Sequence, residues 1–143
     1  MNAGLVADTG GLLRALACRS DGTPSWPAYT KALTEASVVI VPALVLSEVD
    51  YFLRLERPAM QRLVEEILDP GTTYELEAVV AGDLKRAMEI DVKFANLSLG
   101  LVDATVATVA ERRKQYRVLT IDRAHFTALR VGPRYNQALT LVP

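Results

Sequence analysis

Short apolar runs alternate along the chain with longer stretches of helical periodicity. Runs of three to five residues rich in Val, Ile and Leu predict strands that are covered on both faces. The clearest is the β-branched run 38–41, which Pro42 ends. The expected strands are residues 5–7, 38–41, 73–76, 118–120 and 139–142, of which 73–76 has the weakest pattern.

The stretches between these runs have the spacing of amphipathic helices and are bounded by Gly and Pro. The expected helices are residues 11–18, 29–35, 42–54, 58–68, 80–94, 101–114 and 123–129. Strands that alternate with helices predict an α/β sandwich with a mainly parallel sheet. Because there is no internal repeat, low-complexity tract or linker, we expect a single domain over residues 1–143.

Composition excludes several classes of protein. Half of the residues are apolar, 23% are charged and the formal net charge is −1, which excludes a strongly basic coat and an acidic tail. A single cysteine, Cys18, excludes an internal disulfide, and a single histidine, His125, argues against a zinc site. With no apolar run of about 18 residues and no secretory signal, we expect a cytoplasmic protein that does not use a membrane.

The charge is unevenly distributed along the chain. Residues 1–100 carry a net charge of −5, whereas residues 101–143 carry +4. The positive segment is either an ordinary solvated face or a surface that contacts phosphates. Arg123 is the better candidate for a phosphate contact, and Arg112 and Arg113 are weaker candidates because a basic helix end on a solvated face explains them more simply.

Two aspartates come where expected strands end. Asp8 follows the run 5–7, and Asp122 follows the run 118–120 after one residue. Ligand sites of open α/β sheets form beyond the carboxyl ends of the strands. Each aspartate also precedes a helix, so a helix N-cap is the alternative interpretation of either one alone.

Two further acids lie on apolar faces of expected helices. Glu48 has apolar or aromatic neighbours one helical turn away on both sides, namely Leu44, Val45, Tyr51 and Phe52. Asp103 shares a face with Val106, Ala107 and Ala110. Because an unpaired buried charge is costly, each acid is either functional or paired with a buried Arg or Lys.

If these four acids converge, they repel one another by several kcal/mol per pair. Such a cluster persists by protonation or by binding a hard cation. Ligation by oxygen alone, with no His or Cys, favours Mg²⁺ or Mn²⁺. These ions suit phosphoryl transfer, because they polarise a phosphate oxygen and lower the pKa of an attacking water.

Four fragments in this order and spacing resemble the PIN-domain endoribonucleases, specifically the VapC-type toxins of bacterial toxin–antitoxin pairs. The fragments are Val6-Ala7-Asp8-Thr9, Leu46-Ser47-Glu48-Val49, Leu99-Gly100-Leu101-Val102-Asp103-Ala104 and Leu119-Thr120-Ile121-Asp122-Arg123-Ala124-His125-Phe126. The resemblance covers nearly the whole chain and departs from the family pattern at Gly10-Gly11, where a small polar residue is common.

The resemblance implies a PIN-like three-layer sandwich and a ribonuclease that depends on Mg²⁺ or Mn²⁺. It implies that Asp8, Glu48 and Asp103 build the metal site, that Asp122 is a fourth, more variable acid, and that Thr9 and Thr120 support the cluster. It also implies an RNA substrate, a cognate antitoxin and a homodimer. The alternative is a catalytically silent PIN-like module that only binds a partner, and metal binding distinguishes the two.

Overall fold

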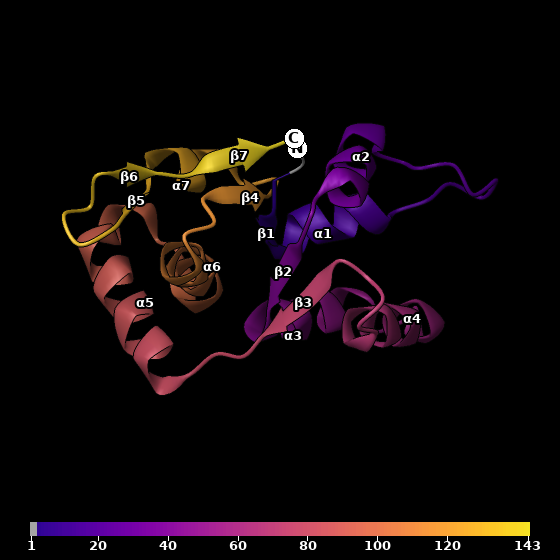
Figure 1. Ribbon diagram of the computed structural model, residues 1–143, viewed down its shortest axis with the longest axis horizontal. Helices are drawn as coiled ribbons and strands as arrows, with labels where there is room; N and C mark the ends of the chain where they lie inside the picture. Colours follow the sequence, from indigo (N-terminus) through magenta and orange to yellow (C-terminus); the bar gives the residue numbers. More distant parts are fainter. Residues whose placement is uncertain (1–2) are drawn as a thin grey trace.

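A five-stranded parallel sheet lies at the centre of the computed structural model, which describes residues 3–143 (Figure 1). The strand order is β3-β2-β1-β4-β7, and every neighbouring pair is parallel. The strands are β1 (Leu5–Ala7), β2 (Val39–Pro42), β3 (Tyr74–Glu77), β4 (Arg117–Leu119) and β7 (Thr140–Val142). All five expected strands are therefore present, with bounds shifted by one residue at most ends.

Helices cover both faces of the sheet. The helices are α1 (Thr9–Leu16), α2 (Pro27–Glu35), α3 (Ala43–Phe52), α4 (Arg57–Leu68), α5 (Ala81–Lys93), the short η1 (Ala95–Leu97), α6 (Gly100–Arg113) and α7 (Arg123–Ala128). In Figure 1, α5 and α6 lie on one side of the sheet, and α1, α2 and α4 lie on the other. The predicted three-layer α/β sandwich with a parallel sheet is confirmed. Within residues 3–143, no helix combines the length and apolar character needed to cross a membrane.

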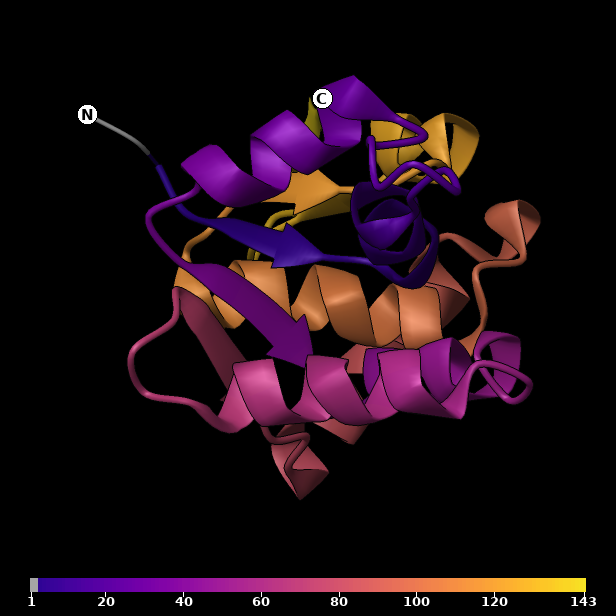
Figure 2. The same ribbon diagram turned by 90° about the vertical axis from the view of Figure 1, so that its right-hand side faces the viewer.

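The core forms where α6 packs along β1 and β2. All three residues of β1 are fully buried. Seven successive residues of α6, 104–110, are also buried, and all of them are Ala, Thr or Val. Small side chains let this helix lie between α5 and the sheet, with α2 on the opposite side of β1 (Figure 2). Asp103 precedes the buried run and therefore lies where α6 emerges from the core.

Two local differences from the prediction have physical causes. Helix α1 begins at Thr9 rather than at residue 11, because Asp8 takes the N-cap position and both glycines continue the helix. A Cβ on Gly11 would overlap the carbonyl of Leu119, so glycine at this position lets α1 approach β4. The antiparallel pair β5 (Arg130–Val131) and β6 (Gln137–Ala138) was not predicted, because two-residue strands are too short to show a pattern.

Candidate metal centre

The four predicted acids line one cleft at the carboxyl edge of the sheet. Strand β1 lies between β2 and β4, so the residues that follow these three strands meet at that edge. Asp8 follows β1, Glu48 lies in α3 after β2, and Asp122 lies between β4 and α7. Asp103 joins them from the first turn of α6. The cleft has a volume of about 360 Å³, and all four acids line it.

Asp8 is the most buried of the four acids. Although it occupies the N-cap position of α1, its side chain makes no capping hydrogen bond. Its Oδ2 instead accepts a hydrogen bond of 2.9 Å from Thr120 Oγ1. Burial raises the pKa of Asp8, the carboxylates of Glu48 and Asp122 raise it further, and hydrogen bonds from the Thr9 amide and the Thr120 hydroxyl partly oppose this. The carboxylate therefore faces the cluster rather than its own helix.

Glu48 is held by a contact across the cleft. Its Oε1 accepts a hydrogen bond of 2.5 Å from Thr9 Oγ1. The expected apolar surroundings were only partly correct, because Tyr51 and Phe52 are both 59% exposed. Only Val45 and Val49 of α3 are buried, so the packed face of this helix is narrow and its last turn reaches solvent. Glu48 is accordingly half-buried at the rim of the core.

Asp122 caps a helix and also lines the cleft with the other acids. Its Oδ1 accepts the backbone N–H of His125 at 3.1 Å and so caps α7. Its Oδ2 lies 2.7 Å from His125 Nδ1, which is also 3.5 Å from Asp103 Oδ2. One potential ligand atom from each of Asp103, Asp122 and His125 lies within 4.8 Å of the other two.

His125 is the residue of this cluster that the sequence analysis undervalued. From the sequence, its place three residues after Asp122 in a short helix favours a structural or solvated side chain, with a phosphate contact as the alternative. In the structure its ring, 31% exposed, lies against two of the four acids. The available signal was its spacing, because residues three apart on a helix share a face and His125 follows Asp122 by three.

The cluster carries more negative charge than its own hydrogen bonds balance. Burial, together with the carboxylates of Asp8 and Asp122, raises the pKa of Asp103 to about 7 against the opposing effect of His125. A divalent cation would relieve the same repulsion without a proton. Carboxylate oxygens with a single imidazole nearby fit Mg²⁺ or Mn²⁺. The residues present therefore fit the metal that the fold implies.

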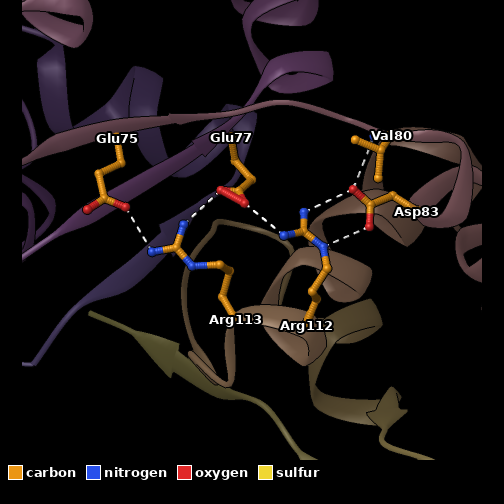
Figure 3. Close-up of polar contacts among 6 residues, drawn as sticks. All are labelled: Glu75, Glu77, Val80, Asp83, Arg112 and Arg113. Atoms are coloured by element: carbon orange, nitrogen blue, oxygen red, sulfur yellow. Dashed lines mark hydrogen bonds and ion pairs between the residues drawn. The ribbon is translucent and has the colours of Figure 1, made fainter.

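Two of the three arginines predicted to contact RNA, Arg112 and Arg113, are not brought to this cleft. Arg112 and Arg113 lie about 14 Å along α6 from Asp103 by the helix rise. Figure 3 shows both guanidinium groups bound by carboxylates of β3 and α5, at distances of 2.7–2.9 Å. Those carboxylates belong to Glu75, Glu77 and Asp83. Arg123 is exposed at the start of α7, next to Asp122. Arg112 and Arg113 hold β3 and α5 to α6.

Comparisons with known proteins agree with the fold. The model of the PIN domain family matches residues 5–130, a range that contains all four acids. Ribonuclease VapC26 of Mycobacterium tuberculosis is 28% identical over 142 residues, covering 97% of this chain and 100% of that protein. The crystal structure of Mycobacterium tuberculosis VapC20, described as a sarcin-ricin loop cleaving toxin, matches with a TM-score of 0.69 and 21% identity. That match covers 87% of this chain and 95% of VapC20 and shows a shared fold.

Proposed function

Because the chain belongs to the PIN domain family, we propose that it is an endoribonuclease that requires Mg²⁺ or Mn²⁺ and hydrolyses RNA phosphodiester bonds. The observation that carries the proposal is the convergence of four carboxylates, from four separate segments, on one cleft. Similarity to ribonuclease VapC26 supports it. We also propose that residues 1–143 act as one PIN domain.

Asp8, Glu48, Asp103 and Asp122 would hold one or two metal ions in this cleft. The ion, when bound, supplies charge that polarises a phosphate oxygen and stabilises the leaving oxygen. Thr120 positions the carboxylate of Asp8, and it accepts the N–H of Asp122 at 3.0 Å as well. The Thr120 hydroxyl thus links the ends of β1 and β4 and fixes the positions of Asp8 and Asp122 relative to each other.

Glu48 is the candidate to orient or deprotonate the attacking water. Thr9 engages its Oε1, which leaves Oε2 to accept a proton. The same hydrogen bond limits the rotation of the carboxylate, so that the accepting oxygen stays in the cleft. Asp103 differs, because a pKa of about 7 keeps it partly protonated near neutral pH until a cation binds.

We further propose that the protein is the toxin of a type II toxin–antitoxin pair, acts as a homodimer and is inhibited by a cognate antitoxin protein. The similarity to two VapC proteins along nearly their whole length supports this. Because VapC20 is described as cleaving the sarcin-ricin loop, an RNA hairpin with that loop is the first substrate to test. Arg123 remains our candidate for a contact to the RNA backbone near Asp122.

The test is cleavage of this hairpin, and of transfer and messenger RNA, with Mg²⁺, Mn²⁺ or a chelator. We expect the wild type to cleave RNA when Mg²⁺ or Mn²⁺ is present and not in the chelator. Asp8→Asn and Asp103→Asn should be folded but inactive. Glu65→Gln, on the exposed face of α4, is the matched control and should cleave normally. If the wild type binds no metal and cuts none of these RNAs, the catalytically silent binding module becomes the better interpretation.

A further inference from the structure

One positively charged side chain shares the cleft with the four acids. Arg14, in the last turn of α1, lines the same 360 Å³ space as Asp8 and Glu48. None of the ion pairs formed within residues 3–143 includes Arg14. By contrast, Arg112 and Arg113 are fully occupied by carboxylates. The N–H groups of the Arg14 guanidinium are therefore available to donate hydrogen bonds beside a site that would hold a phosphate.

Two aromatic rings hold the guanidinium of Arg14 in place. Its Cζ lies 3.9 Å from the ring centre of Trp26 and 5.4 Å from that of Tyr29. The two rings meet edge to face with their centres 6.4 Å apart. Stacking of this kind leaves the N–H groups in the guanidinium plane free to donate hydrogen bonds. It positions the cation without neutralising it.

The aromatic pair is itself connected to the acidic cluster. The hydroxyl of Tyr29 donates to the carbonyl oxygen of Thr120 at 3.3 Å, and the side chain of Thr120 bonds to Asp8. Trp26 precedes α2 and is 44% exposed, although a tryptophan that served only to pack would be covered. An exposed indole stacked on an unpaired arginine is a combination that binds single-stranded nucleic acid.

We propose that Arg14 and Trp26 bind a single-stranded segment of the RNA substrate beside the bond that is cleaved. Arg14 donates to a backbone phosphate, and the exposed indole of Trp26 stacks on a neighbouring base. The inference rests on the proposed ribonuclease function, because the scissile phosphate must then lie at the acids in the same cleft. A base paired within a duplex cannot reach an aromatic face, so the pair selects unpaired RNA.

The protein supplies its own reporter for this contact, because Trp26 is its only tryptophan. The experiment titrates Asp103→Asn protein, which leaves the RNA intact, with an unstructured RNA of about twelve nucleotides, within the usual range of single-strand site sizes. A base stacked on Trp26 quenches its fluorescence. The same RNA annealed to its complement should quench far less. A polyglutamate peptide, which tests an anionic protein partner instead, should not quench.

Variants then separate stacking from charge. In the same background, Arg14→Gln and Trp26→Ala should each weaken RNA binding about tenfold, read from the anisotropy of labelled RNA. Arg14→Gln should also reduce the salt dependence of the affinity by about the contribution of one phosphate contact. Trp26→Phe keeps an aromatic face and should restore most of the affinity. Arg62→Gln removes an exposed arginine on α4, outside the cleft, and serves as the matched control.

The inference is overturned if RNA binds while Trp26 emission and the affinity of Arg14→Gln stay unchanged. Equal quenching by the duplex or by polyglutamate also overturns it. Its failure is distinguishable from failure of the proposed function. Normal RNA cleavage by Arg14→Gln in an otherwise wild-type chain, with none by Asp103→Asn, leaves the ribonuclease and removes the contact. RNA binding that depends on Arg14 and Trp26, in a protein that cleaves nothing, leaves the contact and removes the ribonuclease.

Discussion

Replacing Asp103 by Asn should make the metal-free protein more stable above neutral pH, although it removes an acid of the proposed site. Burial together with the carboxylates of Asp8 and Asp122 raises the pKa of Asp103 to about 7 from its ordinary value of 3.8. The folded state therefore binds this proton more tightly than the unfolded state does. The resulting stabilisation is fully present below about pH 4 and is lost as the pH rises through about 7. At pH 8 the ionised carboxylate destabilises the fold.

The magnitude follows from the two pKa values. One pKa unit corresponds to about 1.4 kcal/mol, so the difference between 7 and 3.8 sets an upper limit of about 4 kcal/mol. Asn keeps the size of the side chain but loses the contact that a carboxylate makes with His125, which reduces the gain. We expect Asp103→Asn to stabilise the metal-free protein by about 1–3 kcal/mol at pH 8, or roughly 2–4 °C in Tm for each kcal/mol.

Thermal unfolding in a chelator between about pH 5 and 8, followed by addition of Mn²⁺, is the assay. The Tm of the wild type should fall as the pH rises, and that of Asp103→Asn should change less. Mn²⁺ at about 100 times its Kd should then stabilise the wild type by about 2.7 kcal/mol. The variant, which lacks one ligand, should gain much less, so that the metal reduces or reverses the difference between the two proteins.

A lower Tm for Asp103→Asn in the chelator at pH 8 would refute this reasoning. So would a wild-type Tm that does not change with pH. Either result would mean that the carboxylates do not repel one another, and a cation would then not be needed to hold them together. Glu65→Gln also removes one negative charge, on an exposed part of α4, but it keeps Asp103 and should show the same pH dependence and the same response to Mn²⁺ as the wild type.

Two further predictions concern positions outside the acidic cleft. In chemical denaturation, Gly11→Ala should destabilise the protein severely, because its Cβ would overlap the Leu119 carbonyl. Gly82→Ala, which faces open space in α5, should instead stabilise it by about 0.5–1 kcal/mol. Equal effects of the two substitutions would contradict the close approach of α1 to β4. Arg112→Gln leaves the buried carboxylate of Asp83 without its partner and should cost about 1–3 kcal/mol in the same assay without changing RNA affinity. Weaker RNA binding at unchanged stability would instead make Arg112 an RNA contact.

The layered fold could be predicted because its strands are buried on both faces. A run such as 38–41 has no polar position to obscure it, and prolines mark the starts of helices such as α2 and α4. The β5–β6 pair could not be predicted, because each strand has two residues and both residues of β6 are exposed. The start of α1 was misplaced because two consecutive glycines normally end a helix, whereas here close packing on β4 requires Gly11.

A residue of the candidate site could be predicted where its position within its own strand or helix is enough to place it at the site. Asp8 and Asp122 follow strands, and the end of a strand is visible in the sequence. Glu48 was assigned to the cluster on a partly mistaken basis, since Phe52 is exposed and the hydrogen bond from Thr9 holds the carboxylate. Contacts between elements, such as Arg14 on Trp26 or His125 on Asp103, have no periodic signal in the sequence.

The distribution of charge explains how a protein with a net charge of −1 can act on a polyanion. The excess of basic residues near the C-terminus does not form an RNA surface throughout, because Arg112 and Arg113 are neutralised by the carboxylates of β3 and α5. Arg14 alone cannot offset four acids in the cleft, so these acids repel an RNA phosphate until a cation neutralises them. Under the proposed function, metal and RNA would therefore bind with positive coupling, and by linkage each would raise the affinity for the other by the same factor.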